Sequence, residues 1–139
     1  MQSIPYGTGE GRNAMGIPVA FCSAIGLDIS GLRRLIWVSG QLAFNERNEL
    51  VGTGDVRAQT EQCLANIERN LRELGGSIDD VVQVTVFVKE MAHLEAIHEV
   101  RLRHFSKPYP TSTLVAVSDF VHPDALVEIN AVAAVRSTD

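Results

Sequence analysis

The sequence predicts a single α+β domain in which one β-sheet carries two helices on one face. The chain has 139 residues, of which 45% are hydrophobic, which is enough for one core but not for two domains. Short β-branched runs and two helical segments follow one another in the order β-β-α-β-α-β-β, without an internal repeat or a low-complexity segment. With two strands at each end, this order favours helices gathered on one face of a sheet.

The chain is expected to begin with an arm or loop over residues 1–17, followed by one domain over residues 18–139. Glycines and a proline interrupt any regular pattern in the arm. The first two strands are expected at 18–27 and 35–43, because each range contains a short apolar run. The polar residues Asn45–Asn48 predict a turn after the second strand.

The first helix is the most regular element of the sequence. Residues at spacings of three and four form one apolar face, and they are Val56, Thr60, Cys63, Leu64, Ile67, Leu71 and Leu74. Thr53 or Asp55 is the expected N-cap, and Gly75-Gly76 ends the helix.

Three strands and one helix complete the domain. Residues 81–88 form a β-branched run with strand propensity, in which Val82, Val84, Val86 and Val88 are expected on one face and Val81, Gln83, Thr85 and Phe87 on the other. A helix is expected from Ala92 to Phe105, with Leu94, Ile97 and Phe105 facing inward, stopped by Pro108 and Pro110. The closing strands are expected at 112–117 and 126–135.

The strands 81–88 and 126–135 carry apolar residues on both faces, but two helices cover only one. An uncovered apolar face is typical of an interface. We therefore expect an oligomer; a wet outer face containing Thr and Gln is the alternative.

Composition narrows the function classes. The net charge is −5 and no basic run reaches five residues, which argues against nucleic acid as a partner. No apolar stretch approaches the roughly 20 residues that span a bilayer, and no targeting signal is recognisable. Cys22 and Cys63 are expected to be free, core-type thiols in a reducing compartment, so the predicted location is the cytoplasm.

Several short segments follow one another in a specific order and spacing: Val38-Ser39-Gly40-Gln41, Gln59-Thr60, Asn66-Ile67, Val82 to Lys89, Pro110, and Val127-Glu128-Ile129 with Ala131 and Ala133. Over roughly residues 18–136, this succession of segments resembles the RidA (YjgF) family. The stretch His122-Pro123-Asp124-Ala125-Leu126-Val127-Glu128-Ile129 is most similar to the subgroup linked to pyrimidine and aminoacrylate breakdown.

The resemblance implies a chorismate-mutase-like fold, a homotrimer around a sheet barrel, and ligand clefts between subunits. It implies hydrolysis of reactive enamines and imines to carbonyl compounds and ammonia, with no metal or organic cofactor. The protein then has to bind the substrate, position a water molecule and move protons.

Within the family pattern, the glutamate that positions the water corresponds to Glu128. This residue shares a strand face with Leu126, Asn130 and Val132, where a carboxylate is costly unless it is paired or hydrogen-bonded. The alternative is a charged residue that points outward near a sheet edge.

The family's carboxylate-binding arginine is absent. The pattern Pro-x-Arg-Ser is here Pro110-Thr111-Ser112-Thr113, so Ser112 stands in place of the arginine, and Leu114 stands where a small residue is frequent. A hydroxyl group cannot form a bidentate, charge-assisted clamp, which predicts poor hydrolysis of iminopyruvate. The three hydroxyls are expected either to bind a less acidic or neutral group or to be ordinary strand residues.

Two further departures lie in the second helix, where His98 replaces a frequent Asn and Arg101 a frequent Tyr. These side chains are neighbours at i and i+3. Arg101 could return a positive charge to the cleft and His98 could carry protons; the alternative is a solvent-facing pair.

Phe21 and Gly40 complete the substrate-binding candidates. Phe21 corresponds to an aromatic residue before the first strand, or else fills the core. Gly40 allows close approach to its backbone. The histidines show no metal-ligand spacing with carboxylates or thiols, so no metal site is expected.

Three function classes remain from the sequence. The first is a cofactor-independent enamine/imine deaminase with altered substrate choice. The second is a non-catalytic trimer that binds a small metabolite. The third, an endoribonuclease or translation inhibitor, is weakest because the chain has neither a basic groove nor stacking aromatics.

Overall fold

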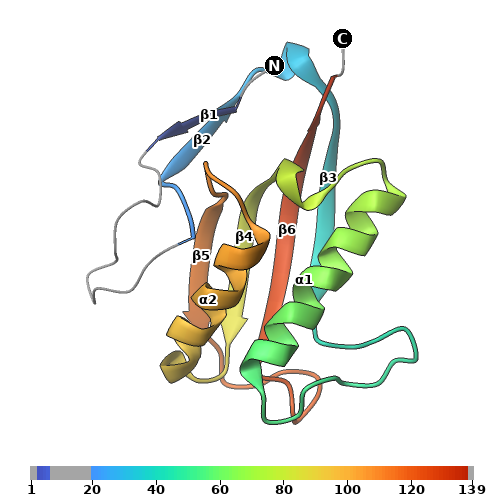
Figure 1. Cartoon of the computed structure of the whole chain (residues 1–139), viewed down its shortest axis with the longest axis vertical. Coiled ribbons are helices and arrows are strands. Elements are labelled where there is room, and N and C mark those ends of the chain that lie inside the picture. Colours follow the sequence, from blue (N-terminus) through green and yellow to red (C-terminus); the bar gives the residue numbers. More distant parts are fainter. Residues whose placement is uncertain (1–2, 7–19, 138–139) are drawn as a thin grey trace.

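The computed structural model describes residues 3–6 and 20–137 and shows a four-stranded mixed sheet with two helices on one face (Figure 1). The strands are β1 (Ser3–Tyr6), β2 (Ala24–Leu27), β3 (Leu32–Gln41), β4 (Val81–Val88), β5 (Thr111–Ala116) and β6 (Val127–Arg136). The helices are α1 (Val56–Glu73) and α2 (Leu94–His104), with single 3-10 turns η1 (Ile29–Gly31), η2 (Ile78–Asp80) and η3 (Met91–His93). This arrangement confirms the predicted α+β class.

The first expected strand does not join the main sheet. Instead, β2 pairs antiparallel with β1 in a separate two-stranded ribbon, which lies beyond one end of the main sheet in Figure 1. The prediction that residues 18–27 form a strand of the same sheet as the other strands was therefore wrong. A short apolar run indicates a strand but does not identify its partner. Ser3–Tyr6 of the expected arm forms β1, and residues 7–17 of that arm lie outside the described residues.

The order of the main sheet is β3-β6-β4-β5. The C-terminal strand β6 lies inside it, antiparallel to both β3 and β4. Strand β5 is parallel to β4, because the intervening helix α2 returns the chain to the starting end of the sheet. The edges of the sheet are therefore β3 and β5.

Helix α1 begins and ends as the sequence predicts. The Asp55 side chain accepts a hydrogen bond from the Ala58 N–H at 3.1 Å and so caps the N-terminus. Gly75 follows the helix with a φ of +85°, a left-handed conformation that glycine adopts without strain. The predicted apolar face is buried except for Leu74, which is 48% exposed because the helix ends just before it.

The core lies between the helices and the sheet. The buried face of β4 contains Val84, Val86 and Val88, and α2 contributes Ile97 and Val100. Phe105 and Leu94 are buried as predicted. Val81 is also buried in the core, although simple alternation placed it on the opposite face. A register shift between Val81 and Gln83 explains the difference, since a bulge reverses the alternation of the pleat.

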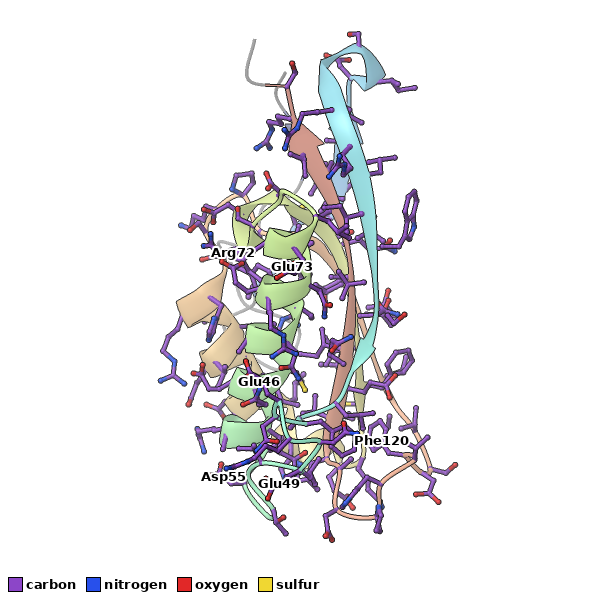
Figure 2. The ribbon with its side chains drawn as sticks, turned by 90° about the vertical axis from the view of Figure 1, so that its right-hand side faces the viewer. Glu46, Glu49, Asp55, Arg72, Glu73 and Phe120 are labelled. Carbon is purple, nitrogen blue, oxygen red and sulfur yellow. The ribbon has the colours of Figure 1, made fainter. Side chains whose placement is uncertain are left out.

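The other face of the sheet, which we call the open face, is not covered by any described helix. Figure 2 shows α1, marked by Arg72 and Glu73, on one side of the sheet and Phe120 on the other. Trp37 is 69% exposed, Leu35 43% and Val115 41%. Along β3, Leu35 and Trp37 alternate with the buried Ile36 and Val38. Among the described residues, no helix is sufficiently long and apolar to cross a membrane.

Candidate functional site

The residues proposed from the sequence separate into two groups on opposite faces of the sheet. Glu128 on β6 pairs in register with Phe87 and lies on the open face between the buried Val127 and Ile129. Ser112 on β5 pairs in register with the buried Val84, and so faces the helices. Strand β4 separates the two strands, which corresponds to about 10 Å of lateral distance. Glu128 and Ser112 of one chain therefore cannot contact the same small molecule.

Glu128 lies against Gly40, because β3 bulges at this point. The register of β3 with β6 shifts between Val38 and Gln41, which brings the Gly40 backbone over the carboxylate. A Cβ atom at Gly40 would lie 2.2 Å from Glu128 Oε2. Bulges of this kind redirect side chains near binding sites, and glycine is required here for the close approach.

A hollow of about 340 Å³ opens beside the Glu128 carboxylate. Its walls are largely apolar and come from β4, β6 and the loop between β5 and β6; they are Phe87, Val117, Asp119, Phe120, Val121 and Glu128. Apart from Glu128, none of these residues was proposed from the sequence. The residue types of Phe87 and of the loop residues gave no signal in the sequence, because only the fold brings this loop over β4 and β6.

Two buried polar side chains on α1 hold the loop that precedes β6 and the segment that follows β3. Gln59 donates hydrogen bonds to the carbonyls of Gly52 and Asp124 and accepts one from the Leu126 N–H at 2.8 Å. It therefore fixes the end of the loop immediately before β6. Asn66 donates to the carbonyls of Leu42 and Phe44, just after β3. The family-like Gln and Asn in this helix thus position loops and do not themselves line the hollow.

The second group lies between α2 and β5, with Arg101 at its centre. This side chain is 0% exposed. Its Nη2 donates to Ser112 Oγ at 2.9 Å and to the Ala20 carbonyl at 3.4 Å. The expectation of a solvent-facing Arg101 is therefore wrong, and the two family departures at Arg101 and Ser112 contact each other directly.

His98 is buried one turn before Arg101. Burial, followed by the nearby Arg101 charge, lowers the pKa of His98 to about 4, so its imidazole is neutral near pH 7. Phe21 is half-buried, and its ring lies 6.5 Å from the His98 ring. Phe21, His98, Arg101 and Ser112 thus form one cluster, which we call the helix-side cluster.

The remaining strand candidates are distributed between the faces. Thr111 donates from Oγ1 to the Val82 carbonyl at 2.9 Å, and Thr113 is exposed. Leu114 packs against the hydrophobic core. Alternation along β5 therefore divides the three adjacent hydroxyls, because Ser112 lies on the face opposite to its two neighbours.

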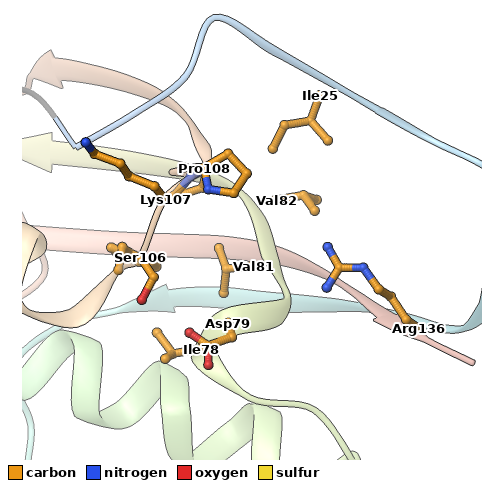
Figure 3. Close-up of a pocket in the computed structure, with 11 residues that line it drawn as sticks. Ile25, Ile78, Asp79, Val81, Val82, Ser106, Lys107, Pro108 and Arg136 are labelled. Carbon is orange, nitrogen blue, oxygen red and sulfur yellow. The ribbon is translucent and has the colours of Figure 1, made fainter. Parts of the chain in front are cut away.

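A second cavity, of about 270 Å³, lies near the far end of β6 (Figure 3). Residues from β2, η2, β4 and the α2–β5 loop form it, together with Arg136 at the end of β6; they include Ile25, Asp79, Val82, Lys107 and Arg136. None of the predicted site residues lines this cavity.

Both cysteines are buried free thiols. Burial raises the pKa of Cys63 to about 12, and the Glu128 carboxylate adds to this effect. A thiol in this state is not a nucleophile near neutral pH. Within residues 3–6 and 20–137, no three His, Cys, Asp or Glu side chains gather in a way that could hold a metal ion.

Comparison with known sequences identifies the relatives of this chain. A family model described as endoribonuclease L-PSP matches residues 21–135. The 3-aminoacrylate deaminase RutC of Acinetobacter baylyi is 39% identical over 99 residues, which cover 71% of this chain and 78% of that protein. A RutC family protein of Pyrococcus horikoshii is 34% identical over 98 residues, covering 70% and 77%.

Solved structures show the same fold. A conserved Rid family protein of unknown function from Yersinia pestis superposes with a TM-score of 0.79 at 28% identity, over 97% of this chain and all of that one. RidA from an Antarctic Psychrobacter gives 0.69 at 27% identity, covering 95% and 99%. The family match over most of the chain, the RutC relatives and the shared fold confirm the resemblance seen in the sequence: the chain belongs to the RidA (YjgF) family.

Proposed function

We propose that this protein is a cofactor-independent hydrolytic deaminase for a small reactive enamine or imine, in which Glu128 positions the attacking water. The observation that carries the proposal is the Glu128 carboxylate, held against Gly40 beside a hollow with apolar walls. A carboxylate in such a place can accept a proton from water and return it to a departing amine. The relative named as 3-aminoacrylate deaminase supports this reaction class.

The reaction needs only water and proton transfers. The enamine is protonated on carbon to give its imine tautomer, and water adds to the imine carbon. The carbinolamine then loses ammonia, so that one water is consumed and one carbonyl compound is formed. Glu128 can orient the water and receive its proton during the addition, which raises the rate because the reacting atoms are held together.

We further propose that the complete site lies between copies of the chain, in a homotrimer. The helix-side cluster and Glu128 occupy opposite faces of one sheet, so a site that uses both groups requires two copies. The exposed Trp37 and Leu35 on the open face provide an apolar surface for such packing. The number three comes from the family resemblance.

The test compares wild type with Glu128→Gln, using Glu73→Gln on the exposed surface of α1 as the matched control. The probe is 3-aminoacrylate, generated in situ and followed by ammonia release. Glu128→Gln keeps the shape but cannot accept a proton as a carboxylate does, so we expect turnover to fall about 100-fold or more. Affinity for a carbonyl product should change little, and Glu73→Gln should behave as wild type.

Each measurement separates the alternatives. If Glu128→Gln releases ammonia at the wild-type rate, Glu128 has no catalytic role. The wild type could also bind the product and yet release ammonia from every small enamine probe at only the spontaneous rate. That result would favour the metabolite-binding alternative. Sedimentation of the wild type should give a species near three times the 15.1 kDa chain mass, and a monodisperse monomer at micromolar concentration would exclude the site between copies.

A further inference from the structure

The second cavity combines apolar side chains with charged side chains of both signs. The apolar residues that line it include Ile25, Val81, Val82, Phe105 and Pro108. Asp79, Lys107 and Arg136 line it as well. A concave surface that places a few polar groups around apolar side chains is typical of a small-molecule site. Its volume of about 270 Å³ is below the roughly 300–1,000 Å³ of sites for drug-sized ligands, so a smaller ligand fits it.

The cavity is separate from both groups of residues described above. Val82 lies near the start of β4, and Phe87, which lines the hollow beside Glu128, lies near its end. Five residues of a strand span about 16 Å, so a small molecule in the second cavity does not contact Glu128. Neither Arg101 nor Ser112 lines the cavity. A ligand in this place is therefore not the compound on which Glu128 acts.

Arg136 and Asp79 provide two opposite charges beside the apolar side chains. Figure 3 shows the Arg136 guanidinium directed toward Val81 and the Asp79 side chain next to Val81, whereas the Lys107 ammonium points away from these groups. Within the described residues, no ion pair joins Asp79 to Arg136. A guanidinium has five N–H donors, so Arg136 can bind a carboxylate in addition to the interactions that it already makes.

Hydrogen bonds on both sides of Asp79 hold its backbone in place at the cavity. The Ser77 N–H donates to Asp80 Oδ2 at 2.8 Å, as part of the capping box of η2. The Ile78 N–H donates to Glu68 Oε2 at 2.5 Å, which ties η2 to helix α1. Asp79 is the middle residue of this turn, so its carboxylate projects from a fixed backbone.

The walls formed by β4 and β6 are fixed in a similar way. Arg136 is the last residue of β6, and the N–H of the next residue, Ser137, donates to the Gly31 carbonyl at 2.8 Å. Thr111 Oγ1 donates to the Val82 carbonyl at 2.9 Å, which joins the end of the α2–β5 loop to β4. A site whose walls are held before binding loses less free energy to ordering when a ligand binds.

We propose that the second cavity binds a small amino acid in its zwitterionic form, with an apolar side chain. The carboxylate contacts Arg136, whose planar guanidinium matches the two oxygens of a carboxylate. The ammonium group contacts Asp79, and the side chain packs against Val81 and Phe105. A carboxylic acid or an amine alone uses only one of the two charged groups. The proposal is independent of the deaminase reaction, because it uses none of the residues proposed for that reaction.

The experiment compares L-norvaline with three analogues, by calorimetry and by NMR of the valine methyl groups. Pentanoate lacks the amine, butylamine lacks the carboxylate, and glycine lacks the apolar side chain. We expect norvaline to shift the methyl signals of Val81 and Val82, but not those of Val121 in the other hollow. Each analogue should bind at least roughly 10-fold more weakly, because it loses either one charge-assisted contact or the burial of the propyl group.

Two variants test the charged contacts. Arg136→Met and Asp79→Asn should each weaken norvaline binding by roughly 10-fold. The matched controls, Arg57→Met and Glu73→Gln, change exposed side chains of α1, and they should bind norvaline as the wild type does. If a variant does not fold, the series of analogues still decides, because it uses only the wild-type protein.

Several results would overturn the proposal. Norvaline that leaves the methyl signals of Val81 and Val82 unshifted does not bind in this cavity. Equal affinity for norvaline and for pentanoate or butylamine would show that one of the two charged contacts is not made, as would unchanged binding by Arg136→Met or Asp79→Asn. Norvaline binding that is lost in Glu128→Gln would place the ligand in the other hollow. Binding that Glu128→Gln leaves unchanged supports a separate site, whether or not the protein releases ammonia from an enamine.

Discussion

The contact between Gly40 and Glu128 allows the position of the carboxylate to be tested by adding one methyl group. In Gly40→Ala, the new Cβ would lie 2.2 Å from Glu128 Oε2, 2.9 Å from Cδ and 3.2 Å from Cγ. Ordinary contacts of this kind are longer than 3.0 Å. The carboxylate must therefore move by roughly 1 Å, and a displacement of that size can reduce a rate about 100-fold.

The cost in stability should be small, which makes the variant informative. The clashing atoms belong to the end of a flexible side chain, and Gly40 does not adopt the left-handed backbone conformation, so alanine fits its φ. Glycine within a strand is itself unfavourable relative to alanine by about 0.5–1 kcal/mol. We expect the free energy of unfolding to change by no more than about 1 kcal/mol while turnover falls about 100-fold.

The assay is ammonia release from an enamine generated in situ, measured with urea unfolding of the same preparations. Ser39→Ala is the matched control, because it changes the adjacent exposed position of β3 without adding an atom near Glu128. If Gly40→Ala turns over substrate at the wild-type rate, the position of this carboxylate is unimportant for the reaction. If it unfolds with a loss of several kcal/mol, Gly40 is a packing residue and the rate carries no information on Glu128.

Two further predictions concern the helix-side cluster. Because the folded-state pKa of His98 is lowered from about 6.5 to about 4, the neutral imidazole stabilises the fold above pH 6.5. This contribution, up to about 3 kcal/mol, is lost as the pH falls toward 4. In urea unfolding, His98→Asn should lose less unfolding free energy than the wild type as the pH falls from 6.5 to 4. If the two proteins show the same pH profile, His98 is not the source of this pH dependence. Ser112→Arg should destabilise the protein, because it places a second cation beside Arg101. The double variant Ser112→Arg/Arg101→Tyr should fold, and it should hydrolyse iminopyruvate faster than Ser112→Arg alone. If the single and double variants have equal melting temperatures and equal rates, the two positions are not coupled.

Regular local patterns made much of the fold predictable. The apolar face of α1, its Asp55 cap and its glycine stop were all readable, because a helix is stabilised by contacts three and four residues apart. The limits of β4 were also correct. The pairing of the strands was harder to predict from the sequence, because the partner of a strand depends on residues far away in the chain. Strand β2, for example, pairs with β1 and not with the main sheet.

The sequence by itself determined the α+β class, the family, and the residues that depart from its pattern, because these follow from local periodicity and from the order of short segments. Only the tertiary structure decided how those residues are combined. It places Glu128 against Gly40 on the open face, and it buries Arg101 against Ser112 beneath α2. The physical reason is that a strand directs alternate side chains to opposite faces, while sheet order and helix packing determine which distant residue each side chain meets.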